Sequence, residues 1–136
     1  MSKKLLIADD ARVIREIIKT AALRAGWEVV GEAANGREAA ELHAATRPDV
    51  CTLDLIMPEY DGLYALRAIR AAAADAKVVM VSAMEQKSLL QEAMKLGAAN
   101  FIIKPFHPKA LLECLEHLAC ASRSAVMELP RAERQA

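Results

Sequence analysis

The stretch Leu5-Leu6-Ile7-Ala8-Asp9-Asp10 places four apolar residues directly before two carboxylates. Further apolar runs also end in a side chain that can handle a phosphoryl group: Val50 to Leu53 before Asp54, Val78 to Val81 before Ser82, and Phe101 to Ile103 before Lys104. If these runs are parallel strands, their carboxyl ends line one edge of a sheet, which is where open α/β folds build their sites. The pattern therefore predicts that three carboxylates, a hydroxyl and an ammonium converge.

Short apolar runs alternate with amphipathic stretches along the whole chain, which favours βα units around a parallel sheet over a bundle or a sandwich. We expect strands at residues 5–8, 27–34, 49–54, 77–82 and 99–104. We expect helices at residues 11–25, 36–46, 62–73, 85–96 and 108–122. The second strand ends without a comparable polar side chain, which fits an edge position. The prediction is a doubly wound, flavodoxin-like (βα)5 fold with strand order 2-1-3-4-5.

The composition predicts one soluble domain of ordinary size. The chain has 136 residues, with 18 basic and 18 acidic side chains, so no global field favours nucleic acid or an acidic membrane surface. No apolar run reaches the length of a signal-peptide core or a membrane span. We therefore expect a cytoplasmic domain at residues 1–122, no nucleic-acid binding by this domain, no membrane insertion, and a tail or the start of a linker at 123–136.

The cysteines do not indicate a bridge or a metal site. Cys51, Cys114 and Cys120 are odd in number, and their spacings match neither a zinc motif nor a redox pair. We expect all three to be buried or partly buried thiols.

The three strand-end carboxylates, Asp9, Asp10 and Asp54, require a cation among them. Like charges about 4 Å apart repel by about 4 kcal/mol at an effective dielectric near 20. A small open cluster of oxygen ligands suits Mg²⁺, with Mn²⁺ as a substitute. The alternative for Asp9-Asp10 is a helix cap followed by a solvated acid, for which one aspartate would suffice.

Asp54 is the natural nucleophile of this set, because a carboxylate beside a divalent cation can attack phosphorus and form an acyl phosphate. Ser82 and Lys104 could donate hydrogen bonds to the new oxygens, the second of them charged. Taken singly, the serine is an ordinary turn residue and the lysine an ordinary solvated one. At matching strand ends, the two together favour the functional interpretation.

With these motifs, the chain resembles the receiver domain of bacterial two-component response regulators over residues 4–121, and is most similar to the CheY-like single-domain chemotaxis regulators. The resemblance implies that Asp54 is the phosphoacceptor, that Asp10 binds Mg²⁺ directly and Asp9 through water, and that Ile56 adds its backbone carbonyl. It also implies a switch hydroxyl at Ser82, a conserved-type lysine at Lys104, and a peptide before Pro105 that is often cis. Phe101 falls where the family places its rotating aromatic.

By the same resemblance, a sensor histidine kinase supplies the phosphoryl group, and the domain catalyses only its own modification and dephosphorylation. Phosphorylation would draw Ser82 inward, turn Phe101, and reshape the face formed by residues 85–122 for a downstream protein. The domain would be a monomer, or a dimer promoted by phosphorylation. The alternative for Phe101 is a plain core aromatic.

Three positions depart from the common family pattern. Phe101 lacks the tyrosine hydroxyl of many chemotaxis regulators. Ile56 and Met84 are apolar where many members carry polar side chains that orient water. We hypothesise that these two apolar side chains shield the acyl phosphate and slow its hydrolysis.

Other classes fit parts of the pattern. A phosphatase of the haloacid dehalogenase type uses similar residues, but Ile56 stands where that class needs a general acid. A flavodoxin-like FMN carrier shares the fold, but the acidic loop after the first strand would repel the flavin phosphate. A receiver domain excised from a longer transcription factor or enzyme remains a third alternative.

Overall fold

A computed structural model describes the backbone of residues 3–123 and the side chains of residues 3–120. Five parallel strands form one sheet in the order β2-β1-β3-β4-β5, which confirms the predicted topology. The strands are β1 (Lys4–Ala8), β2 (Glu28–Ala33), β3 (Val50–Asp54), β4 (Val78–Ala83) and β5 (Asn100–Lys104). Nearly all of the predicted tail, residues 124–136, lies outside the described residues.

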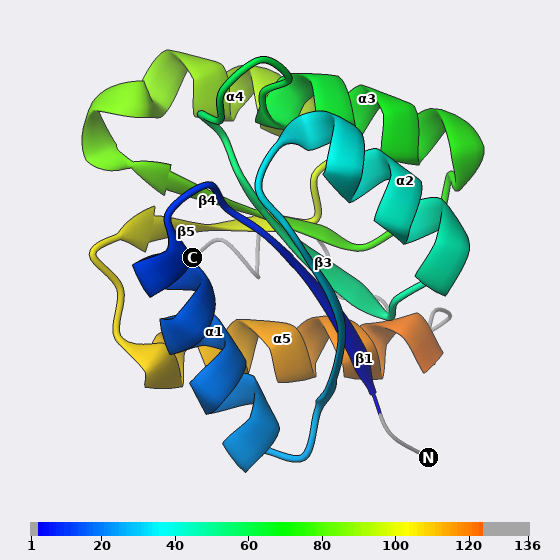
Figure 1. Cartoon of the computed structure of the whole chain (residues 1–136), viewed down its shortest axis with the longest axis vertical. Helices are drawn as coiled ribbons and strands as arrows, with labels where there is room; N and C mark the ends of the chain where they lie inside the picture. Colours follow the sequence, from blue (N-terminus) through cyan, green and yellow to red (C-terminus); the bar gives the residue numbers. More distant parts are fainter. Residues whose placement is uncertain (1–2, 124–136) are drawn as a thin grey trace.

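Five helices cover the two faces of the sheet, α1 and α5 on one side and α2, α3 and α4 on the other (Figure 1). The helices are α1 (Arg12–Arg24), α2 (Gly36–Thr46), α3 (Gly62–Ala72), α4 (Lys87–Lys95) and α5 (Pro108–Arg123). Because every crossover carries a helix, both faces of the sheet are covered, as a parallel sheet requires.

The fourth helix begins later than the sequence predicts. Met84–Gln86 form a 3-10 turn, η1, and α4 starts only at Lys87. The Gln86 side chain accepts a hydrogen bond of 2.9 Å from the backbone N–H of Ala83, which holds this segment in the tighter turn. The loop after Ser82 is therefore a separate short element rather than the first turn of α4.

Local signals fix where α2 and α3 begin, and so shape the loops beside the carboxyl edge. Asn35 Oδ1 accepts from Glu38 N at 2.9 Å, and Asp61 Oδ1 accepts from Tyr64 N at 3.0 Å, so each helix has a side-chain cap. A Cβ at Gly62 would overlap the Asp54 carbonyl oxygen. Only glycine allows α3 to start this close to the end of β3.

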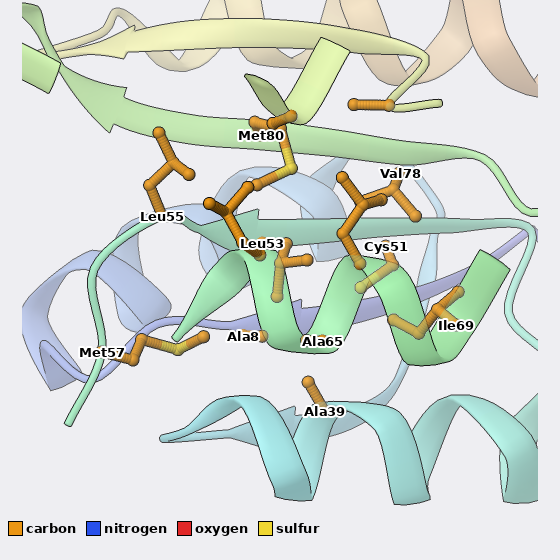
Figure 2. Packing of buried hydrophobic residues seen from close by; sticks show 14 of the residues in the cluster. Ala8, Ala39, Cys51, Leu53, Leu55, Met57, Ala65, Ile69, Val78 and Met80 are labelled. Atoms are coloured by element: carbon orange, nitrogen blue, oxygen red, sulfur yellow. The ribbon is translucent and has the colours of Figure 1, made fainter. Parts of the chain in front are cut away.

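The core forms two apolar layers, one on each face of the sheet. Figure 2 shows part of the layer under α2 and α3, where Leu53 and Met80 from the sheet face Ala65 and Ile69 of α3. The second layer, beneath α1 and α5, includes Ile18, Trp27 and Leu115. Strand β3 is buried along its whole length, so Asp54 is carried by one of the best anchored segments of the chain.

One residue of the predicted apolar stripe of α1 faces solvent. Ile14, Ile17, Ile18 and Ala21 stand at helical spacing in the sequence, a pattern that indicates one apolar helix face. Ile17 is instead 40% exposed, and the fully buried positions are Ile18 and Ala22. Successive helical residues differ by about 100°, so Ile17 lies a quarter turn away from Ile18 and falls at the margin of the stripe.

The prediction for the cysteines is correct for two of the three. Cys51 and Cys114 are buried, and burial raises the pKa of their thiols to about 12 and about 11. Cys120 is exposed, contrary to the prediction. It lies about 140° around α5 from the buried Leu115, which turns it away from the sheet.

Within residues 3–123, no helix has the length and apolar character needed to cross a membrane.

Candidate functional site

The carboxyl ends of β1, β3 and β5 bring most of the predicted site residues together. Asp54 is the last residue of β3, and Asp9 follows β1 directly. Lys104 ends β5 and is held in register with Ala83 of β4. One oxygen each from Asp9, Asp10 and Asp54 lies within 4.8 Å of the others. The predicted convergence of carboxylates at one sheet edge is therefore present in the structure.

The three carboxylates differ in burial. Asp9 is 1% exposed and Asp54 is 5% exposed, whereas Asp10 is open to solvent. Two acids thus form the floor of the cluster and one forms its rim.

Lys104 is the cation of this cluster among the described residues. Its Nζ lies 3.1 Å from Asp9 Oδ2 and 3.4 Å from Asp54 Oδ1. Burial disfavours the ammonium, but the charge of Asp54 and the hydrogen bonds with Asp9 and Asp54 outweigh it and raise the pKa of Lys104. Lys104 therefore stays protonated and bridges the two buried acids.

One ammonium does not neutralise three acids. Burial is the main cause that raises the pKa of Asp54 to about 6, the charge of Asp9 raises it further, and Lys104 partly opposes both. With all three carboxylates ionised and Lys104 charged, the cluster carries −3 + 1, a net charge of −2. Oxygen ligands with an excess of two negative charges fit a divalent cation such as Mg²⁺ or Mn²⁺.

The alternative interpretation of Asp9-Asp10, a helix cap and a solvated acid, describes part of what is seen. Asp9 Oδ1 accepts from the backbone N–H of Ala11 at 2.9 Å, at the start of α1. The same carboxylate uses its second oxygen for Lys104 and is almost fully buried. No side chain caps α1, so this bond holds the turn before the helix, while the same Asp9 carboxylate belongs to the charged cluster.

Ser82 lies beside this cluster but makes no contact with it in the structure. It follows Val81, the register partner of Asp54 on the neighbouring strand. Its side chain is fully buried, and Oγ has no hydrogen-bond partner. A buried hydroxyl without a partner costs about 1–3 kcal/mol, and a hydrogen-bond acceptor at the strand end would remove that cost.

Comparison with known proteins assigns this architecture to a family. The model of the response regulator receiver domain matches residues 5–116. The chain belongs to the response regulator receiver family. The receiver is 48% identical to a chemotaxis protein CheY of Listeria monocytogenes over 116 residues, and this alignment covers 85% of this chain and 98% of the relative. It is 43% identical over 119 residues to CheY of Thermotoga maritima, covering 88% and 99%.

Solved receiver structures agree with the fold. The receiver superposes on the REC domain of AraT, a response regulator from Geobacillus stearothermophilus, with a TM-score of 0.84 at 33% identity, covering 92% of this chain and 98% of that one. It superposes on Vibrio cholerae CheY4 with a TM-score of 0.80 at 31% identity, covering 87% and 99%. A CheY from Borrelia burgdorferi, solved as a complex with CheX, BeF3 and Mg²⁺, gives 0.78 at 28% identity, covering 88% and 87%. These comparisons favour neither the phosphatase nor the flavin carrier.

Phe101 of the receiver is not a plain core aromatic. Its side chain is 42% exposed. On β5, Phe101 and Ile103 alternate with Ile102, and Ile103 packs against the same core layer as Met80, the register partner of Phe101. Phe101 therefore lies on the sheet face that carries Ser82, one diagonal position away from it.

Two apolar side chains that follow the strand ends in the sequence are exposed at the surface. Ile56, two residues after Asp54, is 45% exposed, and Met84, two residues after Ser82, is 74% exposed. Lys104 and Pro105 are joined by a cis peptide bond, as the family resemblance implies.

Sequence reasoning missed one residue that touches the site. The Arg15 Nη1 atom donates a 2.6 Å hydrogen bond to the backbone carbonyl of Asp9. No sequence pattern indicates this contact, because its acceptor is a carbonyl that every residue possesses.

Proposed function

We propose that this receiver accepts a phosphoryl group on Asp54 from a phosphohistidine of a sensor histidine kinase, with Mg²⁺ bound beside it, and that it signals in a CheY-like chemotaxis pathway. The observation that carries the proposal is the clustering of Asp54 with Asp9, Asp10 and Lys104 at the end of the buried central strand. The family and the CheY relatives support it.

The proposed ligands of Mg²⁺ are the carboxylates of Asp10 and Asp54 and the backbone carbonyl of Ile56, with Asp9 contributing through water. The excess of two negative charges in the cluster favours a divalent ion there, and Mn²⁺ would substitute. When bound, the ion neutralises the oxygens of the group in transfer.

In the proposed phosphoryl transfer, Asp54 is the nucleophile and Lys104 stabilises the transferred group. An Asp54 oxygen lone pair forms the new O–P bond, while the P–N bond breaks and its electron pair stays on the departing imidazole of the donor. Since the pKa of Asp54 is about 6, this carboxylate is ionised at neutral pH and ready to attack. Lys104, already 3.4 Å from Asp54, would follow the added charge and pair with a phosphoryl oxygen.

The proposed output is a change of the α4-β5-α5 face. The unpartnered Ser82 hydroxyl would donate to a phosphoryl oxygen, and its inward movement would free space for the Phe101 ring on the same sheet face. Moving a resting population from 1:99 to 99:1 requires about 5.5 kcal/mol of differential stabilisation. Charge-assisted bonds from Lys104, the Ser82 bond and the metal contacts together are of that order.

The proposed partners are a sensor histidine kinase and a downstream protein that binds this face, with the receiver monomeric or dimerising on phosphorylation. The Borrelia burgdorferi CheY in complex with CheX, BeF3 and Mg²⁺ supports a protein partner and a metal in a related receiver. A cytoplasmic location follows from the proposed kinase donor, as for a chemotaxis regulator.

We propose no turnover of external substrates. Ile56 stands where a phosphatase of the aspartyl class needs a proton donor, and an alkyl side chain donates no proton to a leaving group. The chemistry would be limited to modification of Asp54 and hydrolysis of its own acyl phosphate.

Acetyl phosphate and MgCl2, followed by intact-mass measurement, test the proposal. The wild type should gain the mass of one phosphoryl group, and chelation of Mg²⁺ should prevent it. Asp54→Asn is the variant that should gain nothing, and Asp49→Asn, an exposed aspartate at the opposite end of β3, is its matched control. An unlabelled wild type, or a fully labelled Asp54→Asn protein, would contradict the assignment.

A further inference from the structure

We infer that Arg15 is a positioning residue for the metal loop, and that Glu32 on the edge strand holds Arg15 in place. The inference rests on the proposed metal site and extends it to residues outside the acid cluster. It begins from the way in which Asp9 and Asp10 are held.

Asp9 is fixed on every side. Its N–H donates to the Ala33 carbonyl of β2 at 2.9 Å, and its two carboxylate oxygens contact Ala11 N and Lys104 Nζ. Its carbonyl oxygen accepts the 2.6 Å bond from Arg15 Nη1. That carbonyl belongs to the peptide that joins Asp9 to Asp10, and because a peptide is planar, fixing its oxygen fixes the direction in which the chain enters Asp10.

Asp10 has little else to hold it. It is exposed, and in the described part of the chain its carboxylate forms no hydrogen bond or ion pair. The placement of the Asp10 carboxylate, a proposed direct ligand, therefore depends on the backbone. Arg15 is the side chain that contacts the peptide between Asp9 and Asp10.

Glu32 holds the guanidinium at the required angle. Arg15 Nε lies 3.2 Å from Glu32 Oε1, and Lys19 Nζ lies 3.1 Å from Glu32 Oε2, so each oxygen of this carboxylate faces one cation. The hydrogen bond from Lys19 is the main cause that lowers the pKa of Glu32, so the glutamate remains ionised. Arg15 and Glu32 side chains are only 17% and 28% exposed, which shields the pair from solvent more than an ordinary surface ion pair.

A planar guanidinium suits this position better than an ammonium. Its Nε and Nη1 donors point in fixed directions, one toward Glu32 and one toward the Asp9 carbonyl. A lysine at this position carries the same charge, but its three N–H donors share one nitrogen and cannot reach Glu32 and the Asp9 carbonyl from two fixed positions. Charge and geometry can therefore be separated by experiment.

The test measures Mn²⁺ binding by the full chain at pH 8, from the EPR signal of free Mn²⁺ during titration with MnCl2, together with the midpoint of thermal unfolding. Arg15→Gln should raise the dissociation constant about tenfold, the lower end of what loss of a supporting contact costs a metal site. Arg15→Lys should raise it about threefold to fivefold, and Glu32→Gln about threefold. Lys19→Gln, which removes a cation from the same glutamate without touching Asp9, should change it less than twofold.

Each result separates one explanation from the others. Tighter binding by Arg15→Gln would show that the guanidinium acts only by repelling the cation, and would overturn the inference. Equal losses in Arg15→Gln and Lys19→Gln, or lowered unfolding midpoints with unchanged Mn²⁺ affinity, would reduce Arg15 to a structural role. If Arg15→Gln does not fold, Arg15→Lys and Glu32→Gln carry the test alone. A wild type that binds no Mn²⁺ would contradict the proposed metal site itself.

Discussion

The two ends of the parallel sheet carry polar clusters of opposite kind. At the amino end, Glu116 of α5 accepts a 2.8 Å hydrogen bond from Trp27 Nε1 and pairs with Lys3, whose Nζ also lies 5.3 Å from the centre of the Trp27 ring. Acid and base are matched there, and one cluster ties α5 to the sheet. At the carboxyl end, three acids share one ammonium, and the buried Ser82 hydroxyl has no partner. The cluster with paired charges stabilises the fold, whereas the cluster with excess negative charge is the one at which we propose that a divalent cation binds.

The largest expected difference comes from removing the lysine at each end. Lys104→Met leaves Asp9 and Asp54 buried without their cation, and we expect it to lower the free energy of unfolding by about 2–4 kcal/mol at pH 8 without metal. Lys3→Met, at the more exposed cluster, should cost less than about 1 kcal/mol.

Urea titrations of both variants in EDTA measure this difference. Without Lys104 the pKa of Asp54 rises further, so the deficit of Lys104→Met should shrink as the pH falls toward about 6, because a protonated Asp54 no longer needs a cation. Equal deficits at the two ends would break the contrast between the clusters.

Neutralising the acid at the carboxyl end should stabilise the protein. The pKa of Asp54 is raised to about 6, so the folded state binds this proton more tightly than the unfolded state. Stability contributed by the proton is present below the ordinary pKa near 4 and is lost as the pH rises through about 6. Asp54→Asn should therefore unfold with a free energy higher by on the order of 1–3 kcal/mol at pH 8 in EDTA.

Thermal and urea unfolding between pH 4 and pH 8 check this prediction. The advantage of Asp54→Asn should vanish near pH 4, and Mg²⁺ should close the gap by stabilising the wild type more than the variant. Glu116→Gln provides the opposite case, since it removes a paired acid and should destabilise. If Asp54→Asn is less stable than the wild type at pH 8, the ionised Asp54 carboxylate is not destabilised by burial, which contradicts its raised pKa.

The exposed apolar side chain of Ile56, two residues after Asp54, should affect the lifetime of the phosphorylated state. Ile56→Asn is expected to speed loss of the phosphoryl group about tenfold, or about 1.4 kcal/mol in the barrier, because a polar side chain can orient attacking water. Leu23→Asn replaces an exposed apolar residue on α1 and should leave the rate unchanged. Decay of the phosphorylated mass after removal of the donor gives both rates. An unchanged or slower rate in Ile56→Asn would contradict the shielding hypothesis.

The smallest effect concerns thiols rather than charges. Since burial raises the pKa of Cys51 and Cys114 far above the working range, a maleimide at pH 7 should label Cys120 alone among the three cysteines. Cys120→Ser should remove the label and change stability by less than about 0.5 kcal/mol. Rapid labelling of Cys51 in the native protein would mean that the core layer around β3 opens.

The fold and the location of the site were predictable because both rest on local patterns. The apolar runs and the amphipathic stretches between them each act over a few residues, and the strand order followed from which strand ends carry polar groups. Local patterns failed where neighbours decide the outcome. Ile17 lies at the margin of its stripe, and the Gln86 contact with Ala83 converts the start of α4 into a tighter turn.

The sequence alone identified the residue types at the strand ends, and these residue types determine which chemistry this edge of the sheet can perform. How strongly those groups perturb one another depended on packing, because Coulomb interactions and desolvation are governed by distance and burial. Asp9, Asp54 and Lys104 lie far apart in the chain, and only the folded sheet brings their charged atoms to 3.1 and 3.4 Å and shields them from water. The raised pKa of Asp54 and the contact of Arg15 with Glu32 on β2 exist for that reason.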